Sequence, residues 1–204
     1  MKNIKKLCII LAVFLLALPT GCTASSETVV HAEGRERPRF TSRFTRNRST
    51  KPLNEQLATF TTEFDLNDEG RTNNIEKAAE SINETILQPG EIFSFNETVG
   101  PTIEKHGYME AIIFVDGEKE RGFGGGVCQV SSTLYNAVLE IDLEVTERHP
   151  HSRPVFYVEE GKDAATSYGS VDLKFKNTLE FAIKIKAHVV TGEIGKITTE
   201  IVRA

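Results

Sequence analysis

Cysteine is scarce in this chain of 204 residues: Cys8, Cys22 and Cys128 are the only three, and tryptophan is absent. The sequence also lacks internal repeats. Its longest apolar run, residues 7–18, is shorter than the stretch of about 20 residues that a membrane-spanning helix needs. These absences exclude a scaffold held by many disulfides and an array of repeated units. The length suits one domain with a tail.

Basic residues are also scarce in the larger part of the chain. From residue 53 to the C-terminus there are 14 Lys and Arg against 26 Asp and Glu, which gives a formal net charge of −12. Proteins bind nucleic acids by neutralising phosphates with basic side chains. The composition therefore argues against a nucleic acid as a partner.

The first 22 residues have the pattern of an export signal. Three lysines precede the apolar run, and small residues ending in Gly21-Cys22 follow it. The Gly21-Cys22 pair resembles a bacterial lipobox, in which the cysteine is lipidated, although Pro19 stands where that motif has leucine. We expect residues 1–22 to be a signal peptide with a lipobox, Cys22 to be the lipidation site, and the protein to be anchored to the outer face of the cell membrane. Secretion after cleavage nearby and an uncleaved anchor are the alternatives.

Residues 23–52 contain six arginines among Ser, Thr, Pro and Gly, with too few apolar side chains to form a core. This composition predicts a disordered, arginine-rich spacer. The spacer acts either as a basic arm on anionic lipid or wall polymer, or as a soluble linker with incidental charge.

The remaining residues, 53–204, are predicted to form one α+β domain. Apolar side chains spaced by three and four indicate helices at residues 73–87 and 129–142. Alternating, aromatic and β-branched residues indicate strands at residues 57–64, 92–95, 111–115, 154–158, 171–175, 181–187 and 196–202. Because strands dominate the last third, we expect a Gly-rich loop leading into a central helix that packs on a mostly antiparallel sheet.

Three glycines, residues 124–126, immediately precede Cys128 at the predicted start of a helix. Glycine lets the backbone approach a ligand closely, and a helix N-terminus offers free N–H groups and partial positive charge. A thiol placed there loses its proton more easily, and the same N–H groups can hold an oxyanion during acyl transfer. Exported proteins usually pair their cysteines. The unpaired Cys128 is therefore either a nucleophile or a small buried packing residue.

A histidine and an aspartate follow Cys128 along the chain. His149 and His151 precede the predicted strand 154–158, and Asp163 follows it. A thiolate nucleophile usually has a histidine base that a third polar group orients. We therefore assign Cys128 as the nucleophile, His151 as the base because it lies nearer the strand, and Asp163 as the orienting group. This order resembles the core of papain-like and transglutaminase-like enzymes.

Four further residues are predicted to bind substrate. The backbone of Gly125 and Gly126 borders the expected oxyanion site, and the side-chain amides of Gln129 and Asn96 are suited to an oxyanion or a substrate amide. No cofactor is indicated. Residues 65–76 nearly fit a calcium loop, but position five is Glu69 where Asp or Asn is expected, and no helix is predicted before the loop. No second cysteine or close acidic pair completes a zinc site with Cys128, His149 and His151.

Several short blocks of this sequence resemble the VanW family over about residues 57–186. They are Phe93-Ser94-Phe95-Asn96, Gly100-Pro101, Gly107-Tyr108, the run from Gly124 to Ala137, Glu147-Arg148-His149-Pro150-His151-Ser152, Gly161-Lys162-Asp163-Ala164 and the run from Asp172 to Asn177. The block Gly-Gly-Gly-Val-Cys-Gln-Val-Ser-Ser-Thr is specific to that family. The resemblance implies a place in the envelope of Gram-positive bacteria, where such proteins accompany some glycopeptide-resistance clusters, and it leaves the reaction open.

Two functions fit these observations. The first is cysteine-dependent acyl transfer or amide hydrolysis on peptidoglycan peptides or a related envelope substrate. The second is a non-catalytic accessory module, linked to glycopeptide resistance, that binds peptidoglycan or a partner and in which Cys128 only packs. In both, the expected partners are an envelope polymer and the membrane that holds the lipid anchor.

Overall fold

The structure is a computed structural model that describes residues 52–115 and 118–204. The predicted signal peptide, its Cys22 and residues 23–51 of the predicted spacer lie outside the described residues. The described part is α+β with antiparallel sheets, which confirms the predicted fold class. No helix in this part has both the length and the apolar character needed to cross a membrane.

The largest sheet has four antiparallel strands in the order β1-β9-β8-β2. They are β1 (Gln56–Phe64), β9 (Gly195–Arg203), β8 (Ile183–Thr191) and β2 (Ile86–Leu87). Every second residue is buried in the first part of β8 and along most of β9, so one face of this sheet is covered. The strong alternation that predicted strands at residues 57–64, 181–187 and 196–202 is confirmed.

Helix α1 (Glu69–Ile82) begins four residues before the predicted start. Asp68 caps it, since its side chain accepts a hydrogen bond from the backbone N–H of Arg71 at 3.0 Å. The helix ends at Asn83, whose side chain accepts from the N–H of Ala187 on β8 at 3.0 Å. The last residues of the predicted helix instead form β2, because Ile86 and Leu87 pair with β8.

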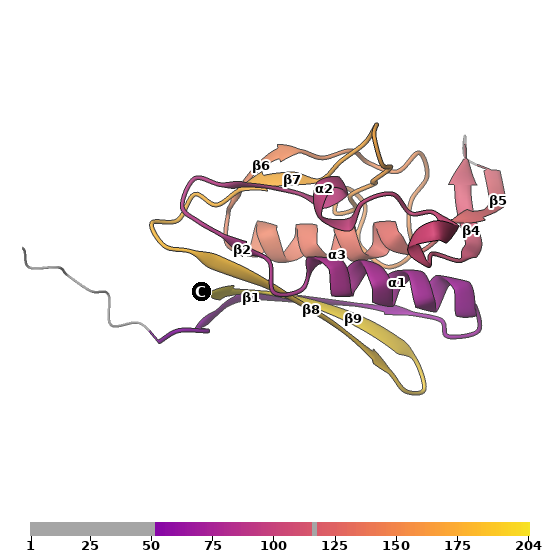
Figure 1. Cartoon of the computed structure of the whole chain (residues 1–204), viewed down its shortest axis with the longest axis horizontal. Helices are drawn as coiled ribbons and strands as arrows, with labels where there is room; N and C mark the ends of the chain where they lie inside the picture. The colour runs from indigo at the N-terminus through magenta and orange to yellow at the C-terminus, as the bar shows by residue number, and fades with distance from the viewer. Residues whose placement is uncertain (1–51, 116–117) are drawn as a thin grey trace, which may run out of the picture. The chain divides into compact units, whose positions relative to one another are not determined.

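Helix α3 (Val127–Glu140) is the central element of the described part. Figure 1 shows α1 and α3 lying on one face of the sheet formed by β1, β8 and β9, with β6 and β7 on the opposite side of α3. Because it is covered on both sides, α3 buries polar side chains as well as apolar ones.

A second antiparallel sheet, in the order β3-β7-β6, contains β3 (Ile92–Ser94), β7 (Lys174–Lys176) and β6 (Glu144–Glu147). A hairpin of β4 (Glu110–Val115) and β5 (Glu118–Phe123) leads into the glycines before α3. The short helices α2 (Phe95–Val99) and η1 (Glu104–His106) connect these elements. The sequence patterns predicted neither α2 nor β5 and β6.

The predicted strand at residues 154–158 is wrong. This segment is irregular and pairs with no strand of the described chain. Its side chains differ in burial although it is not a strand: Phe156 is 81% exposed, whereas the neighbouring Tyr157 is largely buried. Pro154 has no N–H group to donate to a ladder, which also disfavours strand pairing here.

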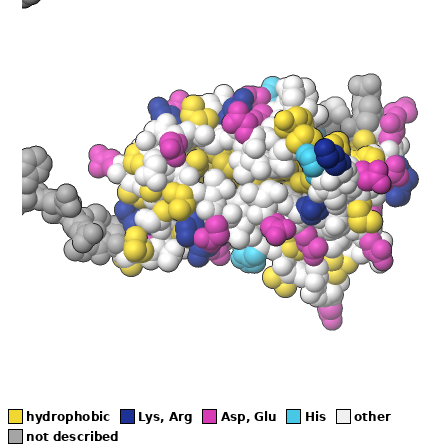
Figure 2. Space-filling model, in the orientation of Figure 1, with side chains coloured by type: hydrophobic (Ala, Val, Ile, Leu, Met, Phe, Trp, Pro, Cys, Tyr) yellow, Lys and Arg dark blue, Asp and Glu magenta, His cyan; other side chains and the backbone are white. Residues whose placement is uncertain are grey.

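Acidic and basic side chains are mixed on one face of the molecule (Figure 2). On the face drawn in Figure 2, acidic groups are scattered among smaller numbers of basic ones, and no continuous basic surface is visible.

Candidate active site

Cys128 is the second residue of α3, and its sulfur is partly buried. Two glycines before it fit their places closely. A Cβ at Gly125 would lie 2.6 Å from the carbonyl oxygen of Ile112, and Gly126 caps the helix with φ +105°, where other residues are strained. The sulfur contacts Thr166, with its carbonyl oxygen at 3.4 Å and its backbone nitrogen at 3.5 Å.

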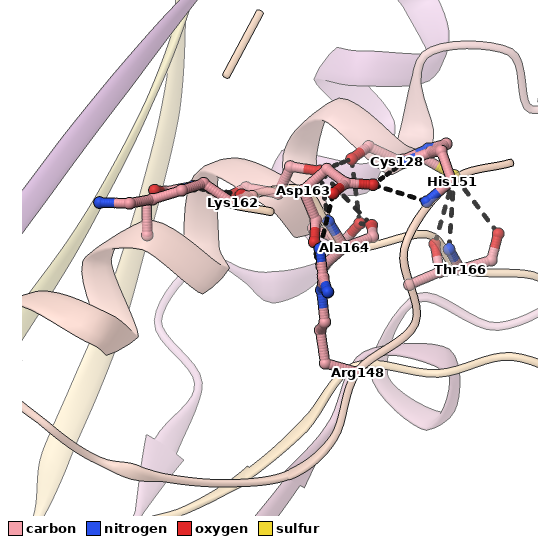
Figure 3. Close-up of polar contacts among 10 residues, drawn as sticks. Cys128, Arg148, His151, Lys162, Asp163, Ala164 and Thr166 are labelled. Carbon is pink, nitrogen blue, oxygen red and sulfur yellow. Dashed lines mark hydrogen bonds and ion pairs between the residues drawn. The ribbon is translucent and has the colours of Figure 1, made fainter. Parts of the chain in front are cut away.

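The structure brings His151 and Asp163 to the sulfur, as the order along the chain predicted. Nδ1 of His151 lies 2.6 Å from Oδ2 of Asp163, and the backbone N–H of His151 donates to the same oxygen at 2.6 Å. Nδ1 of the ring is engaged by Asp163, and the imidazole also interacts electrostatically with the Cys128 thiol. Figure 3 shows the contacts of His151 with Asp163 and those of Cys128 with Thr166.

Arg148 holds the aspartate from the other side. Its Nη2 donates to Oδ1 of Asp163 and its Nε to the Asp163 carbonyl oxygen, both at 2.6 Å, and its guanidinium lies over the ring of Tyr135. The side chains of Asp163 and His151 are only 10% and 16% exposed. Arg148 and His151 therefore both donate hydrogen bonds to the Asp163 carboxylate and fix its orientation.

The protonation equilibria of the three groups are linked. Burial by itself raises the pKa of the Cys128 thiol, but the hydrogen bond and charge of His151 and the hydrogen bonds with Thr166 outweigh it and lower that pKa. Burial lowers the pKa of His151, and the Cys128 and Asp163 groups more than reverse this, so the pKa is raised. Burial raises the pKa of Asp163, but the donors of His151 and the charge of Arg148 bring it below its usual range. These directions favour a thiolate–imidazolium pair.

Polar side chains of α3 hold the segment that carries Asp163 and Thr166. Ser131 Oγ donates to the carbonyl oxygen of Ala164 at 2.6 Å, and the N–H of Ala164 donates to Ser132 Oγ at 2.9 Å. Asn136 Nδ2 donates to the carbonyl oxygen of Lys162 at 2.8 Å. One helix therefore supplies the cysteine and also fixes the backbone on both sides of the aspartate.

A cavity of about 360 Å³ opens beside the sulfur, and both Cys128 and His151 line it. Its walls are mostly apolar. They come from the glycine loop (residues 124–126), α2, the β4–β5 hairpin and the irregular segment at residues 154–158. The apolar lining side chains include Val99, Ile112, Phe123, Val155, Phe156 and Tyr168. A second hollow, of about 380 Å³, lies on the side of His149 and Ser152 and also reaches Cys128 and His151. Cys128 and His151 therefore lie between two hollows and line both of them.

The four residues predicted to bind substrate all line the cavity. Gly125 and Gly126 do so through their backbone. The side chain of Gln129 is fully buried and engaged within the protein: it accepts from Arg71 Nη2 at 2.5 Å and donates to Thr62 Oγ1 and to the carbonyl oxygen of Glu63, both at 2.9 Å. Asn96 Nδ2 donates to the carbonyl oxygens of Ser167 and Val171 at 3.0 and 2.8 Å. The amide nitrogens of Gln129 and Asn96 therefore support the cavity wall.

Two residues that the sequence analysis did not select also line the cavity. Arg71 projects from the first turn of α1, and Tyr157 comes from the irregular segment. Burial and the neighbouring charge of Cys128 raise the pKa of Tyr157, so its hydroxyl stays protonated. Arg71 lies at a helix start that reads as a turn, and Tyr157 lies in the segment predicted as a strand, so neither pattern indicated a functional side chain. In the described residues no group of three or more His, Cys, Asp or Glu side chains is arranged to hold a metal ion.

Comparison with known proteins identifies relatives. The family model described as VanW like protein matches residues 70–202, which include Cys128, His151 and Asp163. "Uncharacterized protein YoaR" of Bacillus subtilis is 41% identical over 140 residues, which are 69% of this chain and 46% of that protein. "Vancomycin B-type resistance protein VanW" of Enterococcus faecalis is 30% identical over 122 residues, 57% of this chain and 44% of that protein.

The chain thus spans less than half of the length of these curated relatives. No solved structure is significantly similar to it. The family model covers well over half of the chain, from the second residue of α1 to the next-to-last residue of β9, residues 70–202. The chain belongs to the VanW-like protein family.

Proposed function

We propose that this protein is a cysteine-dependent enzyme that cleaves or transfers an acyl group at an amide bond. The observation that carries the proposal is the arrangement Cys128–His151–Asp163 beside an open cavity, with the pKa of the thiol lowered and that of the imidazole raised. A cysteine that only packs in a core needs no such partners.

The first half of the reaction is acylation. The Cys128 thiolate attacks the carbonyl carbon of the substrate, a C–S bond forms, and the carbonyl oxygen takes up the negative charge. The imidazolium of His151 then donates its proton to the leaving nitrogen as the C–N bond breaks. The products are a free amine and a thioester on Cys128.

The second half releases the acyl group. Water or an acceptor amine gives up a proton to the neutral imidazole of His151 and attacks the thioester carbon. The C–S bond breaks and the thiolate leaves. Water as the acceptor gives hydrolysis, and an amine gives transfer. Asp163 keeps Nε2 of the ring directed at the sulfur and stabilises the imidazolium.

The start of α3 supplies a donor for the developing oxyanion. The N–H groups of Val127 and Gln129 bond to the carbonyl oxygens of Gly124 and Gly126. In the described part of the chain the N–H of Cys128 has no acceptor. It borders the cavity, where the helix N-terminus favours negative charge. The order of nucleophile, base and aspartate matches that of papain-like and transglutaminase-like enzymes, although His151 lies in a loop instead of a strand.

The relatives and the sequence support a proposal for the substrate class and the location. One relative is named as a vancomycin resistance protein, and vancomycin resistance concerns the bacterial cell wall, so peptidoglycan peptides are the proposed substrates. The proposed location is the outer face of the cell membrane, with a lipid on Cys22. Metabolic labelling with a clickable fatty acid tests the anchor: incorporation into the wild-type chain and none into Cys22→Ser is expected, and equal labelling of both would contradict it.

The experiment that tests the reaction uses the full chain and purified peptidoglycan fragments. After an acid quench, the peptide that contains Cys128 is analysed by mass spectrometry for a thioester adduct. His151→Gln is expected to slow adduct formation by at least about 100-fold, the usual minimum contribution of a general acid–base group. His149→Gln is the matched control, since His149 lies two residues away and bonds instead to Glu147, and it should retain the rate within about threefold.

Reactivity of the sulfur gives an independent check. Cys128 should react with iodoacetamide faster at pH 6 than the same residue in the urea-unfolded chain. Equal rates, together with no adduct on any peptidoglycan fragment, would contradict the enzymatic proposal.

One observation favours a non-catalytic binding role. Large apolar side chains at the edge of the cavity are exposed, with Phe156 at 81% and Tyr168 at 56%, as in surfaces that bind a partner or polymer. If the protein only binds a partner or polymer, Cys128→Ser is expected to keep full function in cells, whereas Phe156→Ala is expected to lose it.

A further inference from the structure

Arg71 has an unusual position in the cavity. It is the third residue of α1, where the cap Asp68 fixes its backbone, and its guanidinium lies over the ring of Phe156. Nη2 donates to Gln129 Oε1 at 2.5 Å, and Gln129 is in turn tied to β1. An arginine has five N–H donors, so most of those on Arg71 remain available to a ligand.

The charge of Arg71 has no ion-pair partner in the described chain. Arg121, Arg148 and Arg203 each pair with a carboxylate, while Arg153 is exposed to solvent. Arg71 is therefore the one partly buried arginine of the described residues without a carboxylate within ion-pair distance. Burial of such a cation is costly, and burial does lower the pKa of Arg71.

The charge of the cavity is opposite to that of the domain around it. No Asp or Glu lines the cavity, although residues 53–204 contain 26 of them. Its ionisable groups are Arg71, His151, Cys128 and the tyrosines Tyr157 and Tyr168. When the thiolate and the imidazolium neutralise each other, Arg71 leaves one net positive charge. A ligand that carries a negative group close to its reacting carbonyl complements this cavity.

We infer that Arg71 binds a carboxylate of the substrate, so that the acyl donor is a peptide with a free carboxylate near the bond that Cys128 attacks. The inference rests on the proposed function and specifies its substrate class. Gln129 accepts a hydrogen bond from the guanidinium of Arg71 and so fixes its position. The apolar cavity walls formed by Val99, Ile112 and Phe123 suit a short aliphatic side chain of the substrate. A guanidinium recognises a carboxylate by paired, charge-assisted hydrogen bonds.

Two small alkylating reagents that differ mainly in charge test this inference without knowledge of the natural substrate. Iodoacetate carries a carboxylate and iodoacetamide a neutral amide, and both form a C–S bond with the thiolate and release iodide. For the full chain, the rate at Cys128 is measured with each reagent, and the ratio of iodoacetate to iodoacetamide is divided by the same ratio for the urea-unfolded chain. This normalised ratio should exceed about 5, since a guanidinium attracts the anionic reagent.

Arg71→Gln should lower the normalised ratio by about tenfold, the effect of losing one charge-assisted hydrogen bond, and Arg71→Lys should retain part of it. Arg153→Gln, which removes an exposed arginine near the second hollow, is the matched control and should leave the ratio within twofold. An unchanged ratio in Arg71→Gln, or an equal fall in Arg153→Gln, would overturn the inference.

The outcomes separate this inference from the proposed function. If Arg71 acts only by stabilising the thiolate, Arg71→Gln slows both reagents equally and the ratio stays constant, which refutes carboxylate binding but keeps the enzyme. If Cys128 reacts with iodoacetamide no faster than the unfolded chain, the proposed function itself fails. The ratio for the wild-type chain decides the matter even where Arg71→Gln does not fold.

Discussion

Replacing Asp163 with asparagine tests the link between the aspartate and the sulfur. The carboxylate accepts both the ring and the backbone N–H of His151, and it pairs with Arg148. Asparagine keeps the size of the side chain and one acceptor oxygen, so the loop retains most of its contacts. What is lost is the negative charge that favours the imidazolium over the neutral ring.

The size of the effect follows from the hydrogen bond to the ring. A hydrogen bond to a charged group is worth about 1.5–3 kcal/mol. One pKa unit corresponds to about 1.36 kcal/mol. Asp163→Asn should therefore lower the pKa of His151 by about 1–2 units and reduce the population of the thiolate–imidazolium pair by roughly tenfold to a hundredfold.

The assay is the rate of iodoacetamide labelling of Cys128 between pH 5 and pH 9, followed by peptide mass spectrometry. In the wild-type chain, labelling should rise with a midpoint below the ordinary thiol pKa of about 8.5. In Asp163→Asn the midpoint should move upward, with the largest loss near pH 6 and convergence of the two curves at high pH. Superimposable curves from two equally folded proteins would refute the reasoning that Asp163 acts on the sulfur through His151.

Three further outcomes are expected. Gly126→Ala should lower the free energy of unfolding by about 1–3 kcal/mol, because its φ of +105° strains any other residue, while the exposed Gly192→Ala should change it little in the same urea titration. Ser132→Ala should cost about 1–3 kcal/mol, since it leaves the buried N–H of Ala164 without an acceptor, and should also slow labelling of the active-site sulfur. The stability that Asp163 contributes through its lowered pKa is complete above the ordinary carboxyl pKa of about 3.9 and is lost as pH falls through the lower folded value. Urea titrations from pH 3 to pH 7 should therefore show a smaller acid loss for Asp163→Asn than for the wild-type chain.

The elements that sequence patterns predicted well are those whose burial alternates regularly. Strands β1, β8 and β9 each turn one face to the core, and their period of two is visible in the sequence. The pattern failed at residues 154–158, where alternating burial comes from a loop that wraps around the cavity. It also missed the first turn of α1, because Gly70 in that turn reads as a loop signal although the helix there passes close to the carbonyl of Glu110.

The chemistry of the candidate site was easier to predict than its support. Cys128, His151 and Asp163 were selected from residue type and order, and the structure brings them together, with His151 hydrogen-bonded to Asp163 and interacting with the Cys128 thiol. Arg148 and Arg71 were missed, because a charged residue in a loop or a first helical turn carries no periodic signal. Only the fold reveals that Arg148 contacts Asp163 and that Arg71 lines the cavity.

The polar face of α3 explains how one helix determines the geometry of the site. Burying Ser131, Ser132 and Asn136 in a helix that packs on two sheets is unfavourable unless each side chain finds a partner. All three bond to the backbone between Lys162 and Ala164, and in the described residues the only buried side-chain polar atom without a partner is Thr199 Oγ1 on β9. Apolar residues would pack the helix equally well, but they would not set the position of that backbone along its axis. Because Cys128 belongs to the same helix, these hydrogen bonds fix the distance between the sulfur and the carboxylate that orients its base, and a shift of one residue in either segment would separate them.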